Sequence, residues 1–137
     1  MRDPGEVSGT ITLLVVDGAN VVGTVPDGWW RRRAEAAGLL RDALAPVAER
    51  GLPDLPGPLE VVLVVEGAAA GTAGSPTVRV VTAPASGDDA IVSLVAREGA
   101  GRRCVVATAD RGLRARVAAQ GAEAVSPSAL PRRSSLR

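Results

Sequence analysis

The sequence of 137 residues contains no histidine, lysine, phenylalanine or tyrosine, and its only aromatic residues are two tryptophans. Without histidine, the chain cannot build a Ser-His-Asp triad, a Cys-His pair or a His-ligated zinc site from its own residues. Its single cysteine, Cys104, cannot form an intramolecular disulfide. Cys104 begins the apolar run 104–107, where we expect a small buried side chain.

The chain also has little that would send it to a membrane. Its first nine residues, MRDPGEVSG, contain no apolar signal-peptide core, and no apolar run approaches the roughly 20 residues that span a bilayer. We therefore expect a cytoplasmic protein without a membrane partner. The length fits one domain, which we place at residues 10–130, with flexible termini at 1–9 and 131–137.

Short apolar runs alternate with segments of helical spacing. The runs at 10–16, 60–65, 78–82 and 103–108 are rich in Val, Ile or Leu and nearly continuous, as in strands covered on both faces of a parallel sheet; a weaker fifth lies at 123–125. Apolar residues recur every three or four positions over 30–49, 89–97 and 113–120. Pro46 should kink or end the first of these helices. This order predicts one α/β domain with a mostly parallel sheet between two layers of helices.

Acidic residues follow every main strand. Asp17 and Glu66 come directly after the first two, Asp88 and Asp89 follow the third after a short loop, and Asp110 follows the fourth. The carboxyl ends of parallel strands share one edge of the sheet, and open α/β folds bind ligands along that edge. The spacing therefore predicts that these five carboxylates converge.

Local backbone chemistry offers another explanation for each acid. Asp17 precedes a glycine and could belong to a turn. Ser86 and Asp89 have the spacing of a helix capping box, and Asp110 could cap a helix that begins near Arg111. Caps alone do not require every strand to end in an acid at the same edge, so we favour convergence.

Converging carboxylates raise each other's pKa values unless a cation neutralises them. Because the chain has no histidine, its ligands would all be oxygen atoms, which suit Mg²⁺ or Mn²⁺, the ions of phosphoryl chemistry. Without the five acids, 16 arginines remain against 10 acids, a net charge of +6. Such a surface would attract a phosphodiester polymer.

Three motifs lie at the predicted strand ends. DGAN at 17–20, SGDDAI at 86–91 and TAD at 108–110, in this order and spacing, resemble the NYN domain, a group within the PIN-like nucleases. The resemblance covers roughly residues 11–130. It implies a PIN-like, Rossmann-like sheet with strand order 3-2-1-4-5, and metal-dependent hydrolysis of phosphodiester bonds, usually of single-stranded or structured RNA.

The resemblance also implies roles for individual residues. Matched by position, the metal ligands would be Asp17, Asp88 or Asp89, and Asp110. Asn20 would orient Asp17 or contact the substrate, and Thr108 would support Asp110. Glu66 is a looser match to a position after the second strand where related domains often carry an acid, frequently Asp.

Arginines and tryptophans supply candidate substrate contacts. The stretch WWRRR at 29–33 could place Arg31 and Arg32 on phosphates and a tryptophan on an unpaired base. It could equally be a helix start, with one tryptophan in the core and the arginines on a solvated face. Arg111 and Arg114 flank Asp110 and could also touch phosphate. The tail arginines, Arg132, Arg133 and Arg137, could add loose affinity.

The sequence thus predicts a ribonuclease that depends on Mg²⁺ or Mn²⁺. The alternative is a non-catalytic module on the same fold that binds RNA or a protein. A phosphatase with Asp17 as nucleophile is disfavoured, because the haloacid-dehalogenase phosphatases need a second Asp two residues later and this chain has Ala19. A protein partner could set substrate choice, and the sequence does not fix the oligomeric state.

Overall fold

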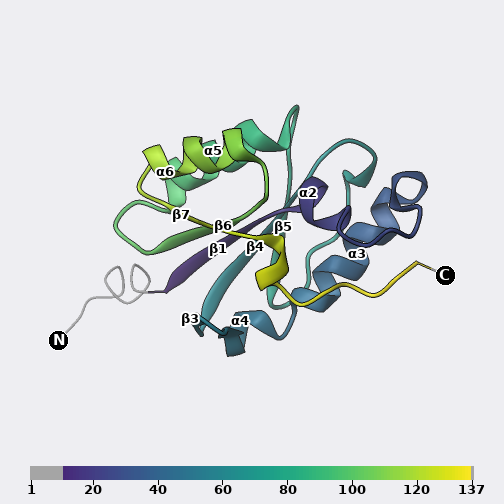
Figure 1. The fold of residues 1–137 in the computed structure, drawn as a ribbon, viewed down its shortest axis with the longest axis horizontal. Helices are drawn as coiled ribbons and strands as arrows, with labels where there is room; N and C mark the ends of the chain where they lie inside the picture. The colour runs from purple at the N-terminus through teal and green to yellow at the C-terminus, as the bar shows by residue number, and fades with distance from the viewer. Residues whose placement is uncertain (1–10, 137) are drawn as a thin grey trace.

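The computed structural model describes residues 11–136, which form a five-stranded sheet between two layers of helices (Figure 1). The strands are β1 (Thr12–Asp17), β4 (Leu59–Val65), β5 (Val78–Thr82), β6 (Cys104–Ala107) and β7 (Glu123–Val125). They lie in the order β5-β4-β1-β6-β7, and all neighbours are parallel. Counted along the chain this order is 3-2-1-4-5, so the predicted α/β class and strand order are confirmed. The predicted flexible segment 1–9 lies outside the described residues.

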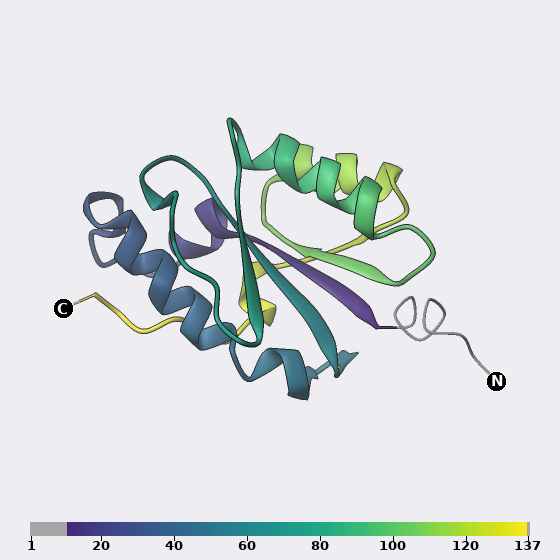
Figure 2. The ribbon, with the colours of Figure 1, turned by 180° about the vertical axis from the view of Figure 1, so that it is seen from behind.

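The helices divide between the two faces of the sheet. The helices α2 (Gly18–Val22), α3 (Arg33–Leu44) and α4 (Val47–Arg50) cover one face, and α5 (Gly87–Glu98) and α6 (Arg111–Ala119) cover the other, as Figures 1 and 2 show from opposite sides. None of the described helices is long and apolar enough to cross a membrane.

Strand β1 contributes to both apolar cores. Leu14 and Val16 pack into the core beneath α3, whereas Leu13 and Val15 pack into the core beneath α5 and α6. Burial on both faces explains the continuous apolar runs. Cys104 lies in the second core, where burial raises its pKa to about 11, so the thiol stays protonated at neutral pH.

Several short elements differ from the sequence prediction. The helix expected over 30–49 is divided into the 3-10 turn η1 (Trp29–Arg31), α3 and α4, with the last break at Ala45 and Pro46, as proline predicts. The structure adds α2, the 3-10 turns η2 (Gly67–Ala69) and η3 (Pro127–Ala129), and an antiparallel pair, β2 (Gly51–Leu52) with β3 (Leu55–Pro56).

Gly18 allows the chain to turn from β1 directly into α2. The register places Asp17 beside Val64 of β4. A Cβ atom on Gly18 would lie 2.5 Å from the carbonyl oxygen of Val64, a separation that requires the backbone to shift. Glycine is therefore needed here because β4 passes so close, and the last strand residue and the first helix residue are consecutive.

The sequence predicts a flexible tail at 131–137; of the described residues 131–136, Arg133 and Leu136 are anchored to the domain. Arg133 is 4% exposed. Its guanidinium donates to the carbonyl oxygen of Val22 at 3.2 and 2.9 Å, to both carboxylate oxygens of Asp27 at 2.8 and 3.0 Å, and to the carbonyl oxygen of Ser134 at 2.9 Å. The Leu136 amide donates to Asp27 at 2.8 Å. This bidentate ion pair holds the segment against the loop that follows α2.

The close approach at Gly18 predicts opposite outcomes for one substitution at two glycines. Gly18→Ala should lower the free energy of unfolding by about 1–3 kcal/mol, because the added methyl group meets the β4 backbone. Gly38→Ala, within α3 and with space for a methyl group, should raise it by about 0.5–1 kcal/mol. Urea denaturation measures both, and equal effects at the two positions would contradict the steric argument.

The Asp27–Arg133 pair predicts a pH-dependent stability. The Arg133 guanidinium and the Leu136 amide hold the pKa of Asp27 well below its ordinary value of 3.8. A depressed carboxyl pKa stabilises the fold above the unfolded pKa, and this stabilisation is lost as the pH falls below about 4. Asp27→Asn should therefore be less stable than wild type at pH 7, and the difference should shrink in acid.

The matched control for that measurement is Asp42→Asn, which removes an exposed carboxylate paired with the neighbouring Arg41. Thermal unfolding of wild type, Asp27→Asn and Asp42→Asn between pH 7 and pH 3 measures how the stability difference changes with pH. A wild-type advantage over Asp27→Asn that is constant across this range would rule out the ionised pair as its source.

Candidate functional site

Asp17 ends the central strand and is 5% exposed. One carboxylate oxygen accepts a hydrogen bond from the Thr108 hydroxyl at 2.8 Å, and the other accepts from the Asn20 backbone amide at 3.5 Å. The register of β1 and β6 explains the first contact. Val16 lies beside Ala107, so the next residues, Asp17 and Thr108, emerge side by side.

Thr108 and Asn20 connect Asp17 to the start of α6. The Thr108 hydroxyl accepts from the Asp110 amide at 3.1 Å while it donates to Asp17, so it contacts both acids rather than Asp110 alone. The Asn20 side-chain oxygen accepts from the Ala109 amide at 2.9 Å. Asp110 caps α6 by accepting from the Leu113 amide at 2.9 Å. These bonds fix the directions of the two carboxylates relative to one another.

Glu66 follows β4 and reaches the start of α5. Its carboxylate accepts a hydrogen bond from the Gly87 amide, the first residue of that helix. A Cβ atom at Gly87 would lie 2.5 Å from this same oxygen, so only glycine leaves room for it. Ser86 caps α5 by accepting from the Asp89 amide at 3.2 Å. Glu66 and the first turn of α5 are thereby held together.

Electrostatic coupling joins the predicted acids, and the contribution of Asp89 to Asp88 is the smallest. Burial raises the pKa of Asp17; the Thr108 and Asn20 hydrogen bonds oppose that rise, and the charges of Asp88 and Glu66 add to it. Burial also raises the pKa of Asp88, and the negative charges of Asp110 and Glu66 raise it further. Asp88 therefore interacts with each of the other three, and we call Asp17, Glu66, Asp88 and Asp110 the carboxylate cluster.

Asp89 lies apart from this cluster. Its carboxylate accepts a hydrogen bond from Arg116 of α6 at 2.9 Å, and 72% of its side chain is exposed. The bond from Arg116, with that from Ser86, lowers the pKa of Asp89. The sequence did not show which of these two adjacent acids belongs to the site. In the structure Asp88 belongs to the carboxylate cluster, and Asp89 forms a surface ion pair.

The cluster is an arrangement of separate carboxylates rather than a closed cage. Among residues 11–136, no group of three or more acidic or cysteine side chains is arranged to hold a metal ion by itself. The first turn of α5 supplies Asp88 and the N-cap position of α6 supplies Asp110, and each helix is capped by a side chain. A helix N-terminus favours negative charge, so this edge can also receive an anionic group.

The four arginines predicted to contact nucleic acid differ in their surroundings. The side chains of Arg31 and Arg111 are exposed and make no hydrogen bond or ion pair with described residues. Arg32 pairs with Glu35, and Arg114 donates to the carbonyl oxygen of Thr108 at 3.0 Å. The last two thus have local partners, and Arg114 supports the loop that carries Asp110.

The tryptophans divide between two environments. Trp29 packs against the core beneath α3, whereas Trp30 is 55% exposed, with the ring centroids 6.1 Å apart in an edge-to-face arrangement. Arg33 lies over Trp29, with its guanidinium carbon 5.5 Å from the ring centroid. It lines a small hollow with Glu66 and Gly18, beside the carboxylate cluster. Sequence reasoning did not single out Arg33 within the WWRRR stretch, because no local pattern signals that it lies beside Glu66.

Thr108 provides a direct test of how Asp17 is held. Thr108→Val keeps the shape but removes the hydroxyl, which leaves an oxygen of Asp17 and the Asp110 amide without their partner. We expect a further rise in the Asp17 pKa and a loss of about 1–3 kcal/mol in unfolding free energy. Carboxyl NMR titration and urea denaturation measure these, and Thr108→Ser is the control that keeps the hydroxyl. An unchanged Asp17 pKa in Thr108→Val would contradict the assignment.

Comparison with known proteins places this geometry in a recognised architecture. No protein-family model and no curated protein matches the sequence. Two crystal structures of Rae1 (YacP) from Bacillus subtilis resemble the fold. A mutant form superposes with a TM-score of 0.70 at 22% identity, over 87% of this chain and 72% of that one. The form without the mutation gives 0.67 at 23% identity, over 85% and 70%. At this level of identity, the likeness establishes a shared fold.

Proposed function

We propose that this protein is a Mg²⁺- or Mn²⁺-dependent ribonuclease that hydrolyses phosphodiester bonds at the carboxylate cluster. The observation that carries the proposal is the convergence of four acids, from the ends of β1 and β4, the first turn of α5 and the N-cap of α6, on one edge of the sheet. The buried position of Asp17 matters most, because a carboxylate desolvated among like charges is costly without a cation.

The oxygen donors of the cluster fit a hard divalent cation. Mg²⁺ is usually held by one or two carboxylates and completes its shell with water and substrate phosphate oxygens, so a ring of three acids is not required. Asp17 and Asp88, whose pKa values are raised by burial and then by neighbouring charges, are the first ligands we propose, with Asp110 and Glu66 beside them. A bound divalent ion would activate water and stabilise the leaving oxygen.

The remaining residues position these acids and the substrate. Thr108 fixes Asp17 and the Asp110 backbone, and Asn20 holds the intervening loop through Ala109. The N-termini of α5 and α6 favour a phosphate at this edge. Arg111, exposed beside Asp110, is placed to meet a phosphate, and the exposed ring of Trp30 can stack on an unpaired base.

The first experiment is cleavage of labelled single-stranded and hairpin RNA in Mg²⁺, Mn²⁺ or EDTA. We expect cleavage in either metal, none in EDTA, and none in Asp17→Asn or Asp110→Asn, whose folds should remain intact by circular dichroism. Near-normal cleavage by both purified variants would refute this mechanism. RNA binding that is unaffected by EDTA, with no cleavage in any metal, would instead support a non-catalytic binding module.

Asp88 and Asp89 form a matched pair of variants. Asp88→Asn should lower the cleavage rate by about a hundredfold or more, because it removes a charge from the centre of the cluster. Asp89→Asn should change the rate only a few-fold, because that carboxylate forms an exposed pair with Arg116. Single-turnover kinetics on one RNA compare the two. Equal losses, or the reverse order, would show that the assignment of Asp88 to the site is wrong.

A further inference from the structure

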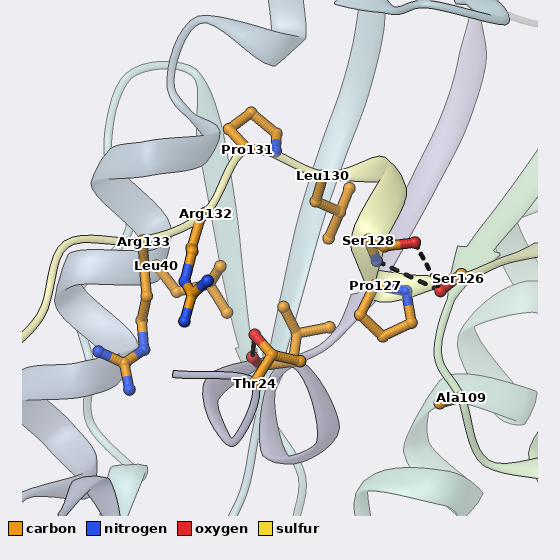
Figure 3. A pocket seen from close by; sticks show the side chains of 11 residues that line it. Thr24, Leu40, Ala109, Ser126, Pro127, Ser128, Leu130, Pro131, Arg132 and Arg133 are labelled. Carbon is orange, nitrogen blue, oxygen red and sulfur yellow. Dashed lines mark hydrogen bonds between the residues drawn. The ribbon is translucent and has the colours of Figure 1, made fainter. Parts of the chain in front are cut away.

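A hollow of about 460 Å³ lies between α2 and the chain that follows β7 (Figure 3). Its walls include Val21 and Thr24 on one side, Ala109 on another, and Ser128, Leu130 and Arg132 on the third. The packed segment anchored by Arg133 forms this third wall. The volume lies within the range of sites that enclose a small organic ligand.

The hollow adjoins the carboxylate cluster through a shared wall. Ala109 lines it and lies between Thr108 and Asp110 in the sequence. The Asn20 side chain holds the Ala109 amide at 2.9 Å, so the position of this wall is fixed relative to Asp17. A chain bound at the cluster could therefore extend into the hollow.

The charge of the hollow suits a phosphate. None of the acids among residues 11–136 lines it, whereas four other hollows of the surface each include at least one: Glu66, Glu60, Asp54 with Glu123, and Asp89. The five N–H groups of Arg133 are already used by Val22, Asp27 and Ser134. Arg132 is exposed and makes no hydrogen bond or ion pair with residues 11–136. Figure 3 shows its side chain extending toward Thr24.

The rest of the lining combines hydroxyl groups with an apolar floor. The Ser126 and Ser128 hydroxyls lie 3.0 Å apart and both residues are exposed. Val21, Leu40 and Leu130 are buried apolar residues that contribute to the lining. A nucleotide presents the matching features: a flat base that an apolar surface can cover, a sugar with hydroxyls, and an anionic phosphate.

We propose that this hollow receives one unpaired nucleotide of the RNA strand, whose phosphate contacts Arg132. The identity of the polymer rests on the function proposed above. The occupant is single-stranded, because a hollow of this volume encloses one nucleotide and has no room for a paired base. Arg132 thus selects how the strand runs past the carboxylate cluster.

The test measures binding separately from cleavage. Fluorescence anisotropy in EDTA, with a labelled single-stranded RNA of eight uridines, compares wild type, Arg132→Gln and the control Arg50→Gln. Arg50 is an exposed arginine of α4 that lies outside the hollow and the cluster. We expect Arg132→Gln to weaken binding at least about tenfold. The slope of log affinity against log salt should fall by about 0.7, as for one lost phosphate contact with a single strand.

Arg50→Gln should bind within about twofold of wild type, with an unchanged salt slope. Ser128→Trp, which fills the rim of the hollow, should also weaken binding of the single strand, while a blunt RNA duplex shows no loss with either hollow variant. Equal affinities and salt slopes for wild type and Arg132→Gln would overturn the proposal. So would a Ser128→Trp protein that binds RNA normally but changes its sedimenting mass, because the hollow would then seat a second copy.

The two proposals fail in distinguishable ways. If the protein cleaves RNA in a metal-dependent way and Arg132→Gln does not change the KM, the ribonuclease proposal stands and the nucleotide site is refuted. Single-strand binding that depends on Arg132 but is followed by no cleavage in any metal would uphold the nucleotide site and remove the ribonuclease. The KM effect is expected to exceed the kcat effect, because Arg132 lies in the hollow and not in the carboxylate cluster.

Discussion

The hydrogen bond from the Thr108 hydroxyl to the buried carboxylate of Asp17 joins the two central strands where they end. It exists because β1 and β6 are parallel and in a register that brings the two residues out together. The same hydroxyl accepts from the Asp110 amide, so it also fixes the position of the residue that caps α6. The site is thus a product of the sheet itself: any change that slides β6 along β1 would separate Asp17 from Thr108 and disorient Asp110.

Helix capping and the proposed chemistry are two uses of one geometry. Asp17 caps α2, where the local interpretation of the sequence proposed a turn, and Asp110 caps α6, as that interpretation proposed. Both also belong to the electrostatically coupled cluster. Capping restricts each carboxylate to one orientation and engages one of its two oxygens; in Asp17 the second oxygen accepts from Thr108. An acid that must cap is already held in place, which reduces the conformational freedom that a bound cation would otherwise have to restrict.

The sequence predicted the sheet well because its strands are buried on both faces. The bounds of β5 and β7 match the prediction, and the others differ by one or two residues. The features that the sequence did not predict depend on contacts between residues far apart in the chain or are very short elements. Helix α2 has only five residues, too few for a periodicity. Asp27 and Arg133 are 106 residues apart, so the packed chain end left no local signal. Asp88 and Asp89 differ only by their direction around a helix, about 100° per residue.

The alternation of β1 between two cores has a consequence for how such a chain can diverge. Its residues point in turn to the α3 side and to the α5 and α6 side. Inserting or deleting one residue within β1 would exchange the two faces and also carry Asp17 away from Thr108. Changes of length should therefore be tolerated in connections such as 70–77, which lies between η2 and β5, and rejected in the central strand. A difference in length between relatives should map to those connections.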